Sequence, residues 1–281
     1  MDADQTEQDH AGLNDDAVPA RGYAMQPVVG LGGSTSCLPS LRAFFRAVPP
    51  DSGLAFVIAL QSLPGQDGHL RELLRHDTRM PVDELDGPVS PQANRVYVVP
   101  PGKTLHAADG HMEAVDGKSV RGRHVSVDLF FRTLADSHGP HATAIVLSGS
   151  DGDGAIGIKR IKERGGLTIA QDPSEAVQGS MPRSAIATGM VDWVLTAAEM
   201  PVRLIEYQRI ERALHLPPED GPQPQEAPVS ADNPAEAALR EVLRFLRVRT
   251  GRDFSYYKRA TVCAGSRAGC RSTASPTCRN T

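Results

Sequence analysis

Several features of secreted, metal-binding or membrane proteins are scarce in this sequence. The 281 residues include only four cysteines, and Cys263, Cys270 and Cys278 crowd near the C-terminus without the C-x-x-C spacing typical of zinc sites. No run of about 18 apolar residues occurs, and the N-terminus lacks the basic start and apolar stretch of a signal peptide. We therefore expect no disulfide framework, no metal site, no direct membrane insertion and a cytoplasmic location.

A large excess of charge of one sign is also missing. The formal net charge is -4, which provides no basic field to attract nucleic acid. We therefore expect no nucleic-acid partner, whereas a protein partner is compatible with this charge. Hydrophobic residues make up 40% of the chain and charged residues 23%, which is typical of a globular domain with a sizeable core.

Apolar runs alternate with helical periodicity over much of the chain. Residues 27–31 are typical of a strand that ends in a glycine turn, and residues 38–48 of a helix; residues 54–60 and 68–76 repeat this unit. The alternation predicts an α/β fold with a doubly wound, mostly parallel sheet flanked by helices. Short strand-like pieces and Asp-Gly or Pro-Gly turns between residues 81 and 115 predict a small antiparallel extension at one edge.

The pattern also predicts where the domain ends. Residues 1–26 are polar and acidic without apolar periodicity, and we expect a disordered tail. Strand and helix patterns then continue to residue 214, so residues 27–214 form the expected domain. A Pro-rich linker follows over residues 215–236, and residues 235–248 have the period of a helix.

A serine stands where the first strand gives way to a helix. At such a turn the Ser34 hydroxyl would be exposed near a helix N-terminus, whose N–H groups can bind an oxyanion. Ser34 could instead only cap the helix, or Gly30, Gly32 and Gly33 could form a phosphate loop, although no known phosphate-loop spacing is matched. The local pattern leaves these alternatives open.

A second candidate loop, Ser148–Gly154, follows another buried strand and precedes a helix. Open α/β sheets bind ligands at the carboxyl ends of their strands. Asp153 could orient a base there, or Asp151 or Asp153 could simply cap the following helix. Two strand-end loops with complementary chemistry favour a catalytic site.

Successive segments of the chain resemble blocks of the CheB-type chemotaxis protein-glutamate methylesterase domain, in the family's order. They are VVGLGGSTSCLPSL, GLAFVIALQSLP, VYVVPPGKTL, SVDLFFRTLA, IVLSGSDGDGAIGIKRIK, GGLTIAQDP and GSMPRSAIATGMVDWVL. The resemblance covers about residues 27–207. It implies a doubly wound parallel sheet and hydrolysis of glutamyl methyl esters, with side-chain deamidation, on methylated chemoreceptors.

The resemblance also assigns roles to individual residues. Ser34 matches the family's nucleophile, and Asp153 matches the aspartate that orients the catalytic histidine. The histidine itself is missing. An ungapped reading through Pro64 places Gln61 at its position, and a shift by one residue would place Ser62 there.

The expected oxyanion pocket departs from the family as well. The resemblance would build it from backbone N–H groups near Thr35 and Ser150. The family's Gly-Gly after the nucleophile is replaced by Ser36-Cys37, and these side chains could crowd the pocket.

A serine hydroxyl is a weak nucleophile at neutral pH and needs an adjacent base. Gln61 can form hydrogen bonds but cannot take the proton, so we expect a methylesterase-type domain with impaired hydrolysis. His69 or His124 could supply a replacement base, and Cys37 could replace the nucleophile, although a buried cysteine is usually inert. The alternatives are a non-catalytic signalling interaction module and a decayed gene product.

The C-terminal part carries a second resemblance. Residues 237–262, which include RTGRDFSYYKRATV, resemble the start of the CheR-type methyltransferase domain found in methylesterase–methyltransferase fusions. Residues 263–281 lose the helical period, which one deleted base in GC-rich codons would explain; the alternative is a genuine disordered tail. We therefore expect a truncated fusion that needs no cofactor, since the methyl donor would bind in the lost part, and no receiver domain in residues 1–26.

Overall fold

The computed structural model describes residues 25–61, 70–108, 110–116, 119–120, 123–124, 126–213 and 234–250. The expected acidic tail, apart from its last two residues, lies outside these ranges. So do most of the expected linker and all residues after Thr250, including the region that resembles a frameshifted tail. Within the described ranges, no helix combines the length and the apolar character needed to cross a membrane.

A seven-stranded sheet in the order β11-β10-β9-β1-β2-β4-β3 forms the centre of the molecule, and all its neighbouring strands pair in parallel. This confirms the predicted doubly wound parallel sheet. The strands are β1 (Val28–Ser34), β2 (Ala55–Gln61), β3 (Val82–Glu84), β4 (Arg95–Val98), β9 (Ala142–Val146), β10 (Leu167–Gln171) and β11 (Trp193–Leu195).

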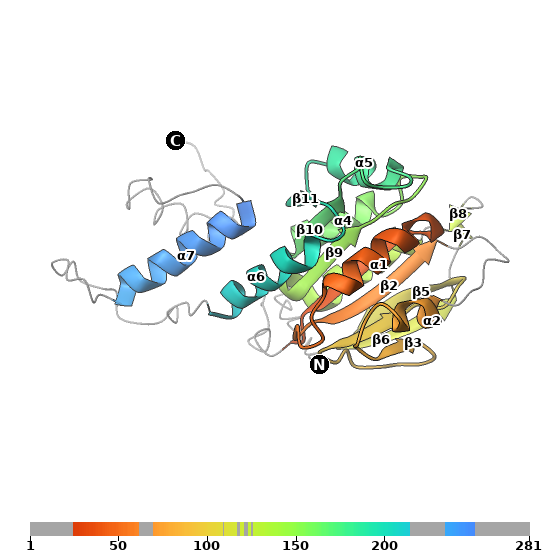
Figure 1. Ribbon diagram of the computed structural model, residues 1–281, viewed down its shortest axis with the longest axis horizontal. Helices are drawn as coiled ribbons and strands as arrows, with labels where there is room; N and C mark the ends of the chain where they lie inside the picture. The colour runs from red at the N-terminus through yellow and green to blue at the C-terminus, as the bar shows by residue number, and fades with distance from the viewer. Residues whose placement is uncertain are drawn as a thin grey trace, which may run out of the picture.

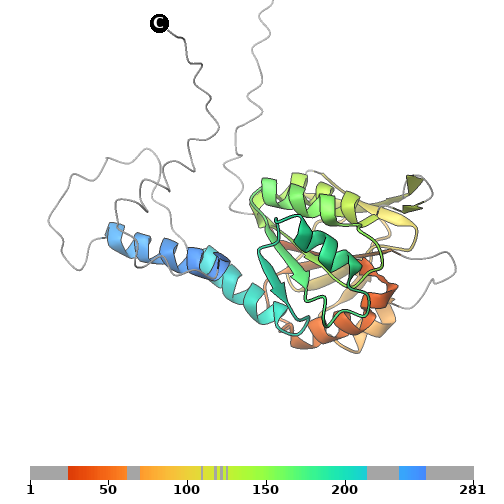
Figure 2. The ribbon, with the colours of Figure 1, turned by 90° about the horizontal axis from the view of Figure 1, so that it is seen from above.

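Helices cover both faces of this sheet and enclose two apolar clusters (Figures 1 and 2). The first face carries α1 (Leu38–Ala47), α2 (Leu70–Arg75) and α6 (Met200–Ala213), and the second carries α3 (Ser126–His138), α4 (Ala155–Glu163) and α5 (Ser180–Ala187). Two short 3-10 helices, η2 (Thr35–Cys37) and η3 (Gly139–His141), adjoin α1 and α3.

The predicted antiparallel extension exists but is smaller than expected. It consists of the hairpin β5 (Lys103–Ala108) and β6 (His111–Asp116), with a further short pair, β7 (Ser119–Val120) and β8 (Arg123–His124). The strands β3 and β4 pair in parallel and extend the main sheet instead. Residues 85–94 return the chain to the opposite end of the sheet, so the turn signals of this stretch do not mark a hairpin.

The glycines of β1 belong to the strand rather than to a turn, so the expected turn at residues 32–33 is wrong. An added Cβ on Gly30 would lie 2.7 Å from Phe130 Cζ, and one on Gly32 would collide with Val127. Because one face of β1 has almost no side chains, α3 can pack directly on its backbone. The glycines therefore serve helix packing, which excludes the phosphate-loop alternative.

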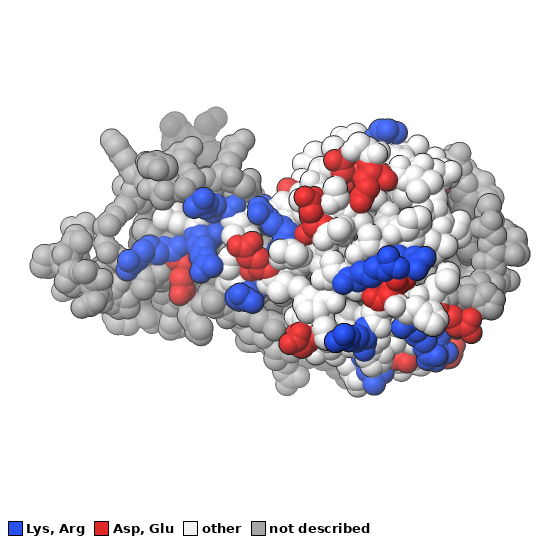
Figure 3. Space-filling model, in the orientation of Figure 1, with Lys and Arg blue, Asp and Glu red and all other residues white. Residues whose placement is uncertain are grey.

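Helix α7 (Pro234–Thr250) confirms the helix expected at residues 235–248 and begins inside the range assigned to the linker. Its last turn is attached to the rest of the molecule by side-chain hydrogen bonds. The Trp193 indole N–H donates to the Arg249 carbonyl oxygen at 2.9 Å, and the Arg249 guanidinium donates to the carbonyl oxygens of Gly165 and Gly166. Figure 3 shows basic side chains gathered over this region.

The packing of α3 on β1 predicts the effect of a single methyl group. Gly30→Ala would place its Cβ against Phe130 and Leu134, and overpacking of this kind costs about 1–3 kcal/mol. The matched control is Gly87→Ala, because a Cβ there meets nothing within 4 Å. Denaturant unfolding should show a lower free energy of unfolding for Gly30→Ala and a change within about 1 kcal/mol for Gly87→Ala. Equal stability of the two variants would contradict the packing argument.

Candidate active site

The residues singled out in the sequence meet at the carboxyl edge of the sheet. Ser34 ends β1 and Gln61 ends β2, and the two are register partners in the parallel pair. On the other side of β1, the loop after β9 contains Ser148, whose carbonyl oxygen accepts the Ser34 N–H at 3.0 Å. The chain runs from β1 to β2 on one side and later returns to β9 on the other. This is the topological switch point where open α/β sheets bind ligands.

The Ser34 side chain caps the following helix and also lies at the candidate site, the two alternatives that the sequence left open. Its side-chain oxygen caps η2 by accepting the backbone N–H of Ser36 at 3.3 Å. Its Oγ also lies 2.8 Å from the Oγ of Ser36. Capping therefore does not remove the hydroxyl from the site, because the residue remains half-buried at the strand end.

Gln61 is hydrogen-bonded to the aspartate loop. Its Nε2 donates to Asp153 Oδ2 at 2.7 Å and to Asp151 Oδ2 at 3.1 Å. Residue 61 thus occupies the place next to Asp153 that the ungapped reading assigns to the missing histidine. Ser62, the alternative for that position, lies outside the described residues.

The Asp153 carboxylate is held by the first turn of α3. It accepts N–H groups from Val127 at 3.1 Å, Asp128 at 2.8 Å and Gly154 at 3.0 Å, and its side chain is buried. Asp153 therefore acts as a cap, but the helix that it caps is α3 and not the following α4.

Asp128, in the first turn of α3, in turn caps α4. It was not identified as a site residue from the sequence. Its Oδ1 accepts the N–H groups of Ile156 at 2.9 Å and Gly157 at 2.8 Å, at the start of α4. Burial raises the pKa of the Asp128 carboxyl, and the charge of Asp153 adds to this effect against the opposing backbone bonds. The only sequence signal for Asp128 is an acidic residue in the first turn of a predicted helix.

Of the two oxyanion candidates, Thr35 directly follows Ser34 in η2. Ser150 belongs to the loop after β9 and lies two positions after Ser148, whose carbonyl oxygen accepts the Ser34 N–H. Ser148 itself was missed, and its Oγ lies 2.9 Å from the Oγ of Ser36. The side chain of Ser36 therefore lies between the hydroxyl groups of Ser34 and Ser148, and the expected crowding of the oxyanion pocket stays a prediction.

The histidines considered as replacement bases are not described in atomic detail. His69 lies outside the described residues, and of His124 only the backbone of β8 is described. Among the described residues, no three His, Cys, Asp or Glu side chains come together in a group that could hold a metal ion.

Cys37 is not a plausible substitute for the serine nucleophile. Its side chain is fully buried, and burial raises the pKa of the thiol to about 12. The nucleophilic form of cysteine is the thiolate, which is almost absent at neutral pH when the pKa is so high.

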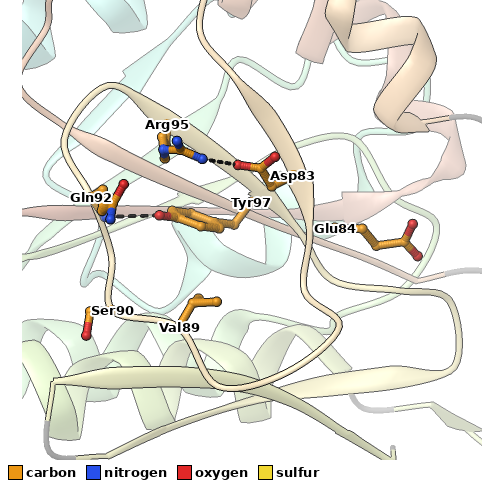
Figure 4. A pocket seen from close by; sticks show the side chains of 7 residues that line it. All are labelled: Asp83, Glu84, Val89, Ser90, Gln92, Arg95 and Tyr97. Atoms are coloured by element: carbon orange, nitrogen blue, oxygen red, sulfur yellow. Dashed lines mark hydrogen bonds and ion pairs between the residues drawn. The ribbon is translucent and has the colours of Figure 1, made fainter.

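A separate cavity of about 400 Å³ lies beside β4 and the edge strand β3 (Figure 4). Arg95 pairs there with Asp83, and the Tyr97 hydroxyl accepts the backbone N–H of Gln92 at 3.1 Å. None of the candidate catalytic residues lines it. The lining residues are Asp83, Glu84, Val89, Ser90, Gln92, Arg95 and Tyr97.

Comparisons with known proteins agree on one family. The profile described as CheB methylesterase matches residues 29–204. A protein-glutamate methylesterase/protein-glutamine glutaminase of Anaeromyxobacter dehalogenans is 32% identical over 194 residues, which cover 69% of this chain and 57% of that protein. The protein-glutamate methylesterase FrzG of Myxococcus xanthus is 31% identical over 194 residues, which cover 68% of this chain and 57% of that protein.

A solved structure shows the same fold. The crystal structure of the Thermotoga maritima CheB methylesterase catalytic domain has a TM-score of 0.60 and 27% sequence identity, and the match covers 64% of this chain and 97% of that one. The chain spans little more than half the length of the two relatives named above, and nearly all of the isolated catalytic domain.

The environment of Cys37 predicts its reactivity. At pH 8 a thiol of pKa about 12 is ionised to roughly one part in ten thousand, against a sizeable fraction for a free cysteine. Iodoacetamide should therefore alkylate Cys37 at least about 100-fold more slowly in the native protein than in guanidinium, as followed by peptide mass spectrometry. Similar rates in the two states would show that the thiol is accessible and would reopen its candidacy as a nucleophile.

Proposed function

Because the chain belongs to the CheB methylesterase family, we propose that it is a protein-glutamate methylesterase domain whose ester hydrolysis is impaired by the residue at position 61. The expected substrates are glutamyl methyl esters, and glutamine side-chain amides, of chemoreceptors or related signalling proteins. The names of the relatives support this substrate class, since both are protein-glutamate methylesterases and that of Anaeromyxobacter dehalogenans is also a protein-glutamine glutaminase. The expected place of action is the cytoplasmic face of such a receptor.

The proposed chemistry is acyl transfer through Ser34. Its Oγ would bond to the ester carbonyl carbon, backbone N–H groups near Thr35 and Ser150 would stabilise the oxyanion, and methanol would leave. Water would then release the glutamate carboxylate. Both halves of this reaction need a group that takes a proton from the attacking oxygen and returns it to the departing one.

One observation carries the proposal of impairment: the Gln61 Nε2 donates to Asp153 Oδ2 at 2.7 Å. In a serine triad, the group in this position accepts the serine proton with one atom and donates to the aspartate with another. A glutamine amide can donate to the aspartate but is too weakly basic to accept the proton. Loss of a triad residue in serine hydrolases lowers turnover by about 10⁴ to 10⁶, and loss of the histidine base lies at the upper end of this range.

The direct test is to restore the imidazole. Gln61→His should hydrolyse a methylated receptor fragment roughly 10²-fold or more faster than the wild type, because a base would lie between Ser34 and Asp153. The measurement is methanol release from the purified full chain. Gln61→Asn is the matched control, since it keeps an amide, and the gain should vanish in Gln61→His with Ser34→Ala.

Two outcomes would contradict the proposal in different ways. A wild-type protein that is already active in a Ser34-dependent manner would show that another residue supplies the base, and His69→Ala and His124→Ala would then locate it. Failure of Gln61→His to gain any Ser34-dependent activity would show that the remaining site is not competent for acyl transfer.

A non-catalytic signalling module is the second candidate, and the hydrogen bonds of Ser34 favour it. Among the described residues, the Ser34 hydroxyl is hydrogen-bonded to the hydroxyl and the backbone N–H of Ser36, and neither group is a base that could activate it. We therefore expect a serine-directed fluorophosphonate probe to leave Ser34 of the wild type unlabelled and to label it in Gln61→His. Intact-protein mass spectrometry reads out both.

A binding measurement distinguishes the hypothesis of an interaction module from that of a decayed gene product. An unlabelled wild type that still binds a methylated receptor fragment in calorimetry would support an interaction module. Rapid labelling of wild-type Ser34 would exclude the module, because it would require an activated nucleophile.

A further inference from the structure

A row of hydroxyl groups leads away from Ser34. The Oγ of Ser34 lies 2.8 Å from that of Ser36, and the Oγ of Ser36 lies 2.9 Å from that of Ser148. Beyond them, the Ser148 Oγ lies 3.2 Å from the Gln178 carbonyl oxygen and accepts the Gln178 N–H at 2.8 Å. Four hydrogen bonds thus link the candidate nucleophile to the loop before α5.

The chemistry of these groups determines the direction of the row. A carbonyl oxygen can only accept, so the single proton of Ser148 is used toward Gln178. Ser148 must then accept from Ser36, and Ser36 must accept from Ser34. With every bond made, the Ser34 proton is directed at Ser36.

This direction is opposite to the one that catalysis requires. The strand order places β1 between β9 and β2. Ser148 follows β9, whereas Gln61 ends β2 and is the register partner of Ser34. A base at position 61 would have to receive the proton on the β2 side, but the row holds it on the β9 side.

We propose that Ser36 is a positioning residue that holds the Ser34 hydroxyl proton away from position 61, so that the nucleophile is restrained independently of the missing base. The proposal rests on the proposed function, because it concerns the same acyl transfer by Ser34. A histidine at position 61 supplies the missing base but leaves the Ser34 proton directed at Ser36. Removal of a hydroxyl group from the row releases that proton.

The experiment uses the full chain with Gln61→His as the background. Ser36→Ala in that background should raise kcat for methyl ester hydrolysis roughly 2- to 12-fold, which corresponds to the net worth of one hydrogen bond, and leave KM unchanged. Ser36→Thr, which keeps the hydroxyl, should show no gain. Fluorophosphonate labelling rates of Ser34 should follow the same order.

A second variant tests the direction of the row without touching Ser36. In Ser148→Ala the Ser36 hydroxyl loses its acceptor and can donate to Ser34 instead, which frees the Ser34 proton for position 61. The labelling rate should rise, as it does in Ser36→Ala. A purely steric effect of the Ser36 side chain would leave the rate unchanged in Ser148→Ala.

The outcomes distinguish this inference from the proposed function. If Gln61→His is active and neither Ser36→Ala nor Ser148→Ala increases kcat or labelling, the positioning role is wrong while the methylesterase function stands. An equal gain in Ser36→Ala and Ser36→Thr would also overturn it, since the hydroxyl would not matter. If no variant with a histidine at position 61 is labelled or active, Ser34 is not the nucleophile and both proposals fail.

Discussion

The close approach of α3 to β1 determines where the parts of the candidate active site lie. Gly30 and Gly32 leave the middle of one face of β1 without side chains, and the aromatic and aliphatic residues of α3 fill that space. The N-terminus of α3 is thereby brought to the carboxyl edge of the sheet. Its free N–H groups bind Asp153, while Asp128 in the same turn binds the N-terminus of α4. The two helices are thus locked to each other by reciprocal caps.

This arrangement makes Asp153 a part of the fold as well as a part of the site. Its carboxylate has three backbone donors, so it stays in place whichever residue stands at position 61. Gln61 uses this preformed acceptor and adds Asp151 as a second one. The site therefore keeps an ordered hydrogen bond between Gln61 and Asp153, with Ser34 at the end of the neighbouring strand. The Gln61 amide, however, cannot relay a proton. Membership of the CheB methylesterase family and a well-packed site do not by themselves guarantee turnover.

Local patterns in the sequence predicted the elements whose burial follows from neighbouring residues. The apolar run at residues 54–60 became β2, and the periodicity at residues 38–48 became α1. The glycines of β1 were read as a turn, because the close approach of a helix nearly a hundred positions away leaves no local signal. Parallel pairing of β4 was missed for a similar reason, since Asp-Gly and Pro-Gly turns do not specify the direction of the next strand. For the site, the resemblance to the methylesterase domain predicted that residue 61 lies next to Asp153, whereas the contacts of Ser148 and Asp128 depend on tertiary structure alone.

The reciprocal caps also bear on how such an active site can change during evolution. Replacement of Asp153 would remove the carboxylate that caps α3, so selection for a folded protein would act against it even if catalysis were no longer needed. Position 61 is different, because its half-buried side chain lies at the end of a strand and, among the described residues, forms hydrogen bonds only with the aspartate loop. A lineage released from selection for hydrolysis would therefore be free to change residue 61 early and Asp153 late. The catalytic set would decay in an order determined by folding rather than by chemistry.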